Sequence, residues 1–145
     1  MTINIVENST YLSNQKKLNI LSKKSIRFFN DREVRAVWDD DNNCWWFSAT
    51  DVVRAINDEP DYTKAGNYWR WLKRKLGQEG IQLVSPTHGF KFEAPDGKQR
   101  IADVLNSDGV ILLAKHYPNN RASKFLDWFT YSDNTIDGQS RKKAY

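Results

Sequence analysis

The stretch EVRAVWDDDNNCWWFSATDVVRAIN, residues 33–57, decides the fold because its hydrophobic pattern changes from strand to helix within one segment. Glu33 to Asp39 alternates between two faces, as a half-buried strand does. Asp40-Asp41-Asn42-Asn43 suits a hairpin turn, since Asn and Asp tolerate left-handed backbone angles. Cys44 to Phe47 is the returning strand, and Ile26 to Phe29 predicts a third strand that completes a meander.

The segment Ser48-Ala-Thr-Asp51 predicts the start of a helix. In a capping box the Ser48 hydroxyl accepts an unpaired amide, and the Asp51 carboxylate reaches back to the cap. The helix is expected to run to about Asn57, before the Glu59-Pro60 break. Three apolar residues should point inward: Val52, Val53 and Ile56.

Three tryptophans, Trp38, Trp45 and Trp46, lie in the two longer strands. Two of them are expected to build the core against the first helix. Neighbouring strand residues point to opposite faces, so Trp45 and Trp46 cannot both be buried in one core unless a bulge intervenes. One of them should cover the far face or meet a partner. Cys44 beside them is expected to be a core or half-buried thiol rather than a nucleophile.

The second half of the chain predicts a second hairpin and two helices. Pro95-Asp96-Gly97 is a turn between strands at Phe90–Ala94 and Lys98–Ile101. A further short strand is expected at Ile81–Val84, and a buried helix at Asp103–His116. Apolar residues at helical spacing predict a last helix capped by Asn119 or Asn120: Ala122, Phe125, Leu126 and Phe129. The expected fold class is α+β, a small antiparallel sheet (three-stranded meander plus a second hairpin) packed with about four helices.

Length and composition are consistent with one folded unit. With 145 residues, of which 39% are hydrophobic, the chain can bury one core. We expect a flexible N-terminal arm at 1–24, one domain at 25–131, and a polar linker at 132–145. The single cysteine excludes an internal disulfide. Neither a membrane span nor a signal peptide is evident, so the expected location is the cytoplasm.

The segment NYWRWLKRKLG, residues 67–77, predicts a two-faced helix that ends at Gly77. One stripe should face the core: Ala65, Tyr68, Trp69, Leu72 and Leu76. Between Lys64 and Leu76 there are five cations and no acid, and Trp71 falls among the cations. A solvated surface helix is one interpretation. Nucleic-acid binding is the other, because cations neutralise phosphates and an exposed aromatic ring can pack on a sugar or base.

The uninterrupted charge favours nucleic acid, because surface helices usually mix both signs. More cations occur on the expected hairpin. The candidate DNA-binding residues from charge and aromatic character are Lys64, Arg70, Trp71, Lys73, Arg74, Lys75, Lys91, Lys98 and Arg100. The net charge of +4 also fits double-stranded DNA, contacted at its phosphate backbone. Whether the helix and the hairpin share one side of the domain is not decided by the sequence.

No catalytic constellation is evident. His88 and His116 have no partner at a metal-ligand spacing, and no glycine-rich phosphate loop is present. Asp39–Asp41 is expected to be a solvated turn rather than a cation site. We therefore expect no metal, no cofactor and no enzymatic activity in this chain.

Four motifs occur together in this chain: IRFFNDREVRAVWDDDNNCWWFSATDVVRAI, NYWRWLKRKL, a Gly-Phe-Lys hairpin with PDGK, and Ile101-Ala-Asp-Val104 at the expected start of a helix. With this combination Ser25 to Thr130 resembles the Bro N-terminal domain of phage antirepressors, baculovirus Bro proteins and bacterial DNA-damage-inducible D-type proteins. The resemblance implies a DNA-binding module, often N-terminal to a different effector domain. It also implies nucleic-acid contact by the basic helix, at Arg70, Lys73, Arg74 and Lys75, with Asn67 as a polar candidate.

The tail SDNTIDGQSRKKAY, Ser132 to Tyr145, is similar to the opening of Fic-family domains. Fic domains transfer AMP or related groups onto hydroxyl side chains, but their H-P-F-x-[DE]-G-N-G-R signature is missing here. The similarity implies a regulatory N-terminal module of a longer Bro–Fic protein, phage-derived or otherwise, or a remnant of one.

The alternative function is a protein-interaction module of the antirepressor type. It would present exposed tryptophans, Trp71 among them, to another protein or to its own C-terminal domain. A convex strip shared by Trp71 and the cations favours DNA, whereas a flat apolar patch ringed by mixed charges favours a protein partner.

Overall fold

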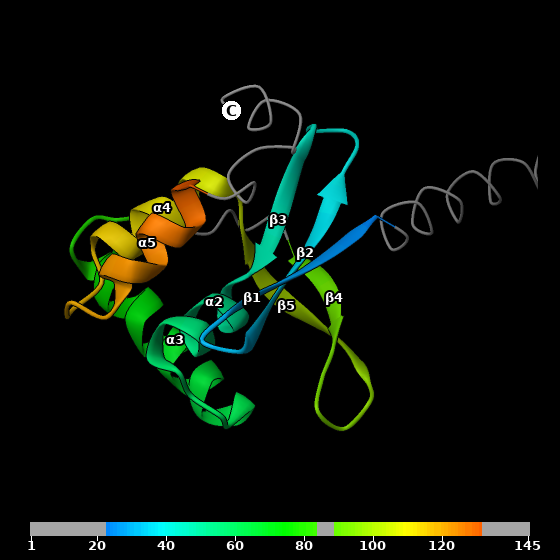
Figure 1. The fold of residues 1–145 in the computed structure, drawn as a ribbon, viewed down its shortest axis with the longest axis horizontal. Helices are drawn as coiled ribbons and strands as arrows, with labels where there is room; N and C mark the ends of the chain where they lie inside the picture. Colours follow the sequence, from blue (N-terminus) through cyan, green and yellow to red (C-terminus); the bar gives the residue numbers. More distant parts are fainter. Residues whose placement is uncertain (1–22, 84–88, 132–145) are drawn as a thin grey trace, which may run out of the picture.

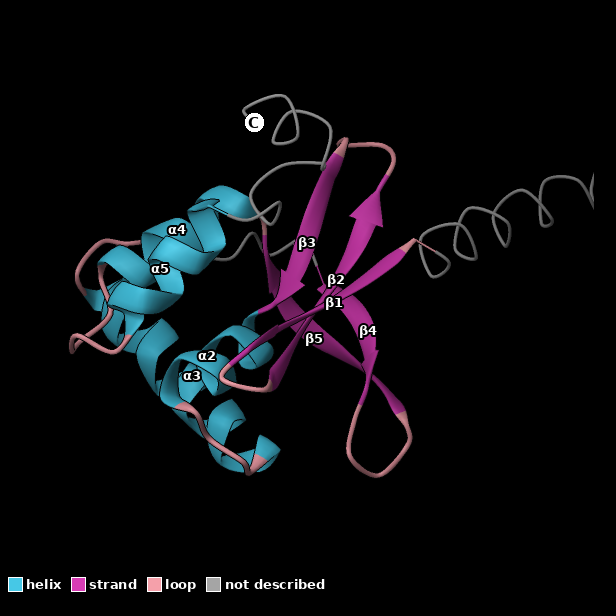
Figure 2. Cartoon of the chain, viewed as in Figure 1, coloured by secondary structure: helices cyan, strands magenta, loops and turns pink. Residues whose placement is uncertain are grey.

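The computed structural model of the chain describes residues 23–83 and 89–131. The elements are β1 (Lys24–Phe29), β2 (Arg32–Asp39), β3 (Cys44–Ser48), α2 (Ala49–Asn57), α3 (Tyr62–Gln78), β4 (Gly89–Glu93), β5 (Gln99–Leu105), α4 (Ser107–Lys115) and α5 (Ala122–Tyr131). The helices gather beside a curled sheet (Figures 1 and 2). The α+β class and the four expected helices are thus confirmed in the described part. No described helix is long and apolar enough to cross a membrane.

The predicted meander and the predicted hairpin belong to a single antiparallel sheet in the order β1-β2-β3-β5-β4. The hairpin joins the meander where Phe47 pairs with Leu105 and Ser48 with Val104. The sheet edges are therefore β1 and β4. Lys24, which the sequence assigned to the arm, belongs to β1. Residues 1–22 of the expected arm lie outside the described residues.

Two predictions for the middle of the chain are wrong. Residues 103–105 were expected to begin a helix, but they extend β5, because Val104 and Leu105 are buried on opposite faces and pair with β3. The helix starts only at Ser107, where the Asn106 side chain accepts a hydrogen bond from the Gly109 amide at 2.8 Å. The strand expected at 81–84 does not form at residues 81–83, and Val84 lies outside the described residues.

The main core lies between one face of the sheet and the helices. Val34 and Ala36 from β2 and Phe47 from β3 meet the inward residues of α2 there. The inward residues predicted for α2 are all buried: Val52, Val53 and Ile56. In α5 the predicted spacing is confirmed, since Ala122, Phe125 and Phe129 are buried and Leu126 packs partly buried against the same core. The Asn119 side chain accepts the Arg121 amide at 2.9 Å just before that helix.

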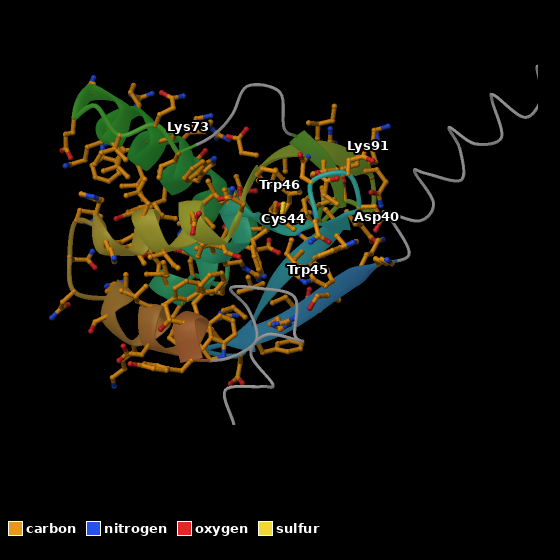
Figure 3. The ribbon with its side chains drawn as sticks, turned by 90° about the horizontal axis from the view of Figure 1, so that it is seen from above. Asp40, Cys44, Trp45, Trp46, Lys73 and Lys91 are labelled. Atoms are coloured by element: carbon orange, nitrogen blue, oxygen red, sulfur yellow. The ribbon has the colours of Figure 1, made fainter. Side chains whose placement is uncertain are left out.

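The other face of the sheet holds a second, smaller apolar cluster formed by Val37, Trp46, Phe92 and Val104. Trp45 and Trp46 leave opposite sides of β3 (Figure 3), as the strand period predicts. The expectation that two tryptophans build the core against the first helix is wrong. Trp46 fills the second cluster, Trp45 packs only partly buried against the main core, and Trp38 packs edge-on to Trp45 at 5.3 Å.

The start of α2 confirms half of the expected capping box. The Ser48 hydroxyl accepts the Asp51 amide at 3.2 Å. The Asp51 carboxylate does not return to the cap; it binds the Arg35 amide at 3.0 Å and the Arg35 guanidinium at 2.7 and 3.0 Å. An arginine on the adjoining strand offers more donors to this carboxylate than the cap amide does. The helix ends at Asn57, before Glu59-Pro60, as predicted.

The basic helix α3 is capped by Asp61, whose carboxylate accepts the Thr63 and Lys64 amides. Its predicted end at Gly77 is wrong, because the helix continues to Gln78. The left-handed residue after it is Gly80, with φ of 84°. A glycine at this position avoids the strain that a Cβ would impose. The left-handed glycine that follows the helix is therefore Gly80, three residues after the expected Gly77.

Candidate nucleic-acid interface

The helix α3 has the buried stripe that its sequence predicts. Ala65, Trp69, Leu72 and Leu76 are buried, and Tyr68 packs half-buried against the same core. Trp71 lies off this stripe and is 41% exposed. The remaining side chains of α3 are therefore available at the surface, and the neighbours of each decide what it can do.

Three polar candidates form one ridge on the side of α3 opposite its buried stripe: Asn67, Arg70 and Arg74. They are spaced by three and four residues, which places them one above another on a helix. All three are exposed. Arg70 donates a hydrogen bond to the Asn67 side chain, whereas the side chain of Arg74 has no hydrogen bond or ion pair with any residue that the structure describes. We call these three residues the outer ridge.

A cleft of about 540 Å³ separates α3 from the β4–β5 hairpin. Arg70 and Lys73 line it from the helix, and Arg100 and Ile101 line it from β5. The hairpin turn and the start of α3 both lie at the lower side of the molecule in Figure 1. The structure therefore places the basic helix and part of the basic hairpin on one side of the domain.

Asp103 on β5 connects the two walls of the cleft. One oxygen of its carboxylate accepts hydrogen bonds from the Trp69 indole N–H and from the Lys73 ammonium, each at 2.8 Å. Burial opposes ionisation of Asp103, but these two donors outweigh it and hold the pKa of the carboxyl below its ordinary value. Because the sequence predicted that Asp103 begins a helix, it gave no indication of this contact.

Arg35 on β2 makes a second connection. Its guanidinium pairs with Asp51 on α2 at 2.7 Å and donates to the Glu93 carbonyl of β4 at 2.8 Å. It also lies 5.2 Å from the centre of the Phe92 ring. Burial opposes the charge of Arg35, but the Asp51 carboxylate outweighs it and raises the pKa of Arg35. The hairpin is thus attached to both α2 and α3.

Several candidate cations are already paired with carboxylates. Lys73 pairs with Asp103 at 2.8 Å, Lys75 with Glu79 at 2.7 Å, and Arg100 with Asp96 at 2.6 Å. Hydrogen bonds from Arg100 and from the Lys98 amide lower the pKa of Asp96. The side chains of Lys64, Lys91 and Lys98, like that of Arg74, have no ion pair within residues 23–83 and 89–131. The predicted basic surface is therefore partly neutralised.

Trp71 belongs to the flank of α3 that faces away from the cleft. Its ring lies 5.3 Å from that of Tyr68, which in turn stacks on Tyr117 at 6.0 Å. Helical spacing places Lys64 and Lys75 on this same flank. The candidate contact face is thus divided into a cleft flank, the outer ridge and an aromatic flank.

The two hairpin lysines occupy different places. Lys98 follows Gly97, which has φ of 84°, at the β4–β5 turn. Lys91 lies far from Lys73, at the end of the molecule that carries Asp40 (Figure 3). It lines a separate cavity of about 470 Å³ together with Lys24 and Arg35. Lys91 is therefore not among the residues that line the cleft, although it pairs across the strands with Ile101, which does line it.

The described residues give no metal centre, since no group of three or more His, Cys, Asp or Glu side chains is placed to hold an ion. Cys44 is half-buried, as expected, and burial together with the nearby Asp39 charge raises the pKa of its thiol. Asp39 is buried rather than solvated, and its carboxylate accepts the Trp46 indole N–H at 2.9 Å.

Comparison with protein-family models gives a match over most of the chain. The model described as the BRO family, N-terminal domain, matches residues 33–136, a range that starts at the second residue of β2 and extends beyond α5. No curated protein and no solved structure matches the chain significantly. The Fic-like tail expected at Ser132 to Tyr145 lies outside the described residues, and the family match does not support it.

Proposed function

This chain belongs to the BRO family through its N-terminal domain, and from this premise we propose that it is a non-catalytic module that binds double-stranded DNA. In this proposal α3 contacts the duplex with its outer ridge. Arg70 and Arg74 bind phosphates in this proposal, and Asn67 is the ridge residue suited to a base edge, because asparagine can form bidentate hydrogen bonds there. Lys64 and Lys98 add phosphate contacts beside the ridge.

The observation that carries the proposal is the outer ridge. Asn67, Arg70 and Arg74 all point away from the core of a helix whose other side is firmly buried. None of the three is paired with a carboxylate in the described part of the chain. A rigid helix with unpaired cations along its exposed ridge is suited to a polyanion, because no internal ion pair has to be broken before binding.

The arrangement around α3 supports the same function. The helices α2 and α3 follow one another across the four residues 58–61 and pack against each other. In helix-turn-helix proteins the second helix of such a pair enters the major groove. With 17 residues, α3 is about 25 Å long, more than the width of that groove.

The biological role in this proposal is regulatory. A DNA-binding domain of this kind directs an attached effector domain, of Fic type or another type, to a DNA site. The coding frame beyond Tyr145 tests this part: an effector domain in frame supports it, and a stop codon at that point contradicts it.

One observation favours protein binding as a second function. The aromatic flank, defined by Trp71, Tyr68 and Tyr117, lies away from the cleft, and Trp71 is 41% exposed. If DNA reaches Lys64 on this flank but not its aromatic rings, the rings stay free for a protein partner. Trp71→Ala should then leave DNA affinity unchanged while it weakens binding of that partner.

A titration of labelled duplex DNA, followed by fluorescence anisotropy, tests the main proposal. The variant Arg70→Ala/Arg74→Ala removes two cations from the outer ridge. The matched control Lys24→Ala/Lys124→Ala removes two exposed cations from β1 and α5, which form no ion pair in the described structure. The proposal requires a much larger loss of affinity for the ridge variant; equal affinities for both variants, or no binding by the wild type, contradict it.

A further inference from the structure

We propose that the protein straddles one strand of the DNA, with α3 in the major groove and the β4–β5 hairpin in the adjacent minor groove, where Ile101 makes an apolar contact. This inference rests on the proposed function, because it assumes that α3 contacts duplex DNA. It adds to that function a contact in the minor groove, made by the β4–β5 hairpin through Ile101, a residue that the charge pattern does not identify.

The cleft provides the space that this arrangement needs. In a DNA duplex one sugar–phosphate strand separates the major groove from the adjacent minor groove. A protein that places one element in each groove must therefore leave a gap for that strand. The cleft of about 540 Å³ lies between α3 and the hairpin. Arg70 lines it from the helix and Arg100 from the hairpin. Two carboxylates, Asp96 and Asp103, line it beside their ion-pair partners Arg100 and Lys73.

The wall of the cleft also permits a close approach by phosphate. Thr63 and Gly66 line it on the α3 side. A threonine hydroxyl can donate to a phosphate oxygen, and the Arg70 guanidinium packs over Gly66, 3.7 Å from the position that a Cβ would take there. The strand would therefore lie between a helix wall with hydroxyl and cationic donors and a hairpin wall with Arg100.

Ile101 is the apolar side chain that this arrangement uses for the minor-groove contact. It lines the cleft from β5 and is 72% exposed, so its side chain contributes little to either apolar cluster. Its neighbour Arg100 and the nearby Lys98 are cations. Proteins that bind the minor groove combine basic residues with inserted apolar side chains such as isoleucine. An exposed isoleucine between the hairpin cations and the cleft fits that chemistry.

The spacing of the two elements is fixed before DNA arrives. Asp103 attaches β5 to Trp69 and Lys73 of α3, and Arg35 attaches the Glu93 carbonyl of β4 to Asp51 of α2. A pre-organised pair of elements loses less conformational entropy on binding. Asp96, which pairs with Arg100 at 2.6 Å, competes with phosphate for that guanidinium and so moderates the affinity.

The experiment compares two isoleucines that are both exposed. Ile101→Asp places a carboxylate in the cleft. Ile26→Asp, the matched control, makes the same change at a 53% exposed position on β1, which lines the separate cavity of about 470 Å³ and not the cleft. Because both variants alter the net charge equally, the difference between them measures position alone. Ile101→Ala removes the apolar contact without adding charge, and circular dichroism checks that each variant is folded.

DNA affinity is measured by anisotropy on one duplex, with and without netropsin, a ligand that occupies the minor groove. We expect Ile101→Asp to bind about tenfold more weakly than Ile26→Asp, a difference of about 1.4 kcal/mol. Ile101→Ala should be weakened by a smaller factor, and netropsin should displace the wild type.

The failures can be distinguished. If the wild type does not bind duplex DNA, the proposed function and this inference both fall. If the ridge variant loses affinity while the two aspartate variants bind alike and netropsin has no effect, α3 binds DNA and the inference of minor-groove contact is overturned.

Discussion

The Lys73 ammonium lies 2.8 Å from the Asp103 carboxylate, and the same oxygen accepts the Trp69 indole N–H. This contact joins the middle of α3 to the last strand of the sheet, 30 residues later in the chain. Lys73 is therefore a structural cation in this molecule, although its position in a basic helix suggests a phosphate contact.

Lys73→Ala is expected to lower the free energy of unfolding by about 0.5–1 kcal/mol, because the ion pair is partly exposed to solvent. Its effect on DNA affinity should be smaller than that of Arg74→Ala, since Arg74 has no ion-pair partner in the described structure. Urea denaturation measures the first effect and anisotropy the second. A larger loss of DNA affinity for Lys73→Ala than for Arg74→Ala would contradict this role.

Asp51→Asn should destabilise the fold by about 3–5 kcal/mol, because Asp51 is 2% exposed and its loss leaves the Arg35 charge without a counter-ion. Asp58→Asn is the control. Asp58 also pairs with an arginine, Arg32, at 3.0 Å, but its side chain is 58% exposed, so the expected loss is below about 1 kcal/mol. Urea denaturation of both variants checks the prediction. A similar loss of unfolding free energy in the two variants would refute it.

Stability should fall in acid partly through Asp39. Burial opposes the charge of this carboxylate, but hydrogen bonds from Asn42, Trp46 and the Asp41 amide outweigh it and lower its pKa. The contribution is then complete above the ordinary aspartate pKa of about 3.9 and is lost as the pH falls through the lower folded value. Urea denaturation between pH 2 and 6 should show a weaker pH dependence for Asp39→Asn. Identical pH profiles for the two proteins would exclude this contribution.

Cys44 should react slowly with iodoacetamide in the folded protein. Burial, and after it the Asp39 charge, raises the pKa of the thiol, so less thiolate is present near neutral pH. The alkylation rate at pH 8 should be well below that of the protein unfolded in urea, and it should increase as the pH is raised. Equal rates in the folded and unfolded protein at pH 8 would show that the thiol is not shielded.

The sequence predicted correctly those elements whose pattern lies within one short segment. The alternation in residues 33–39 gave β2, and the helical spacing from Ala65 to Leu76 gave the buried stripe of α3. Ser48 marked the start of α2 correctly, because a cap is a contact between residues three positions apart.

Contacts between distant segments account for the errors. Val104 and Leu105 form an apolar pair that suits a strand or a helix, and only the pairing with Phe47 and Ser48 selects the strand. Asp51 of α2 was assigned to the cap because its actual partner, Arg35, lies on strand β2, 16 residues away in the sequence. For the same reason the sequence identified the cations of the candidate site but not the carboxylates that neutralise Lys73 and Arg100.

The salt dependence of DNA affinity tests the central proposal most directly. The logarithm of the association constant falls linearly with the logarithm of the salt concentration, with a slope of about −0.9 for each phosphate neutralised. Arg70→Ala/Arg74→Ala should make the slope less steep by one to two such contacts, whereas Lys24→Ala/Lys124→Ala should leave it unchanged. If the wild type binds duplex DNA with no salt dependence, or if both variants keep the slope of the wild type, the proposal that the outer ridge of α3 contacts DNA phosphates is contradicted.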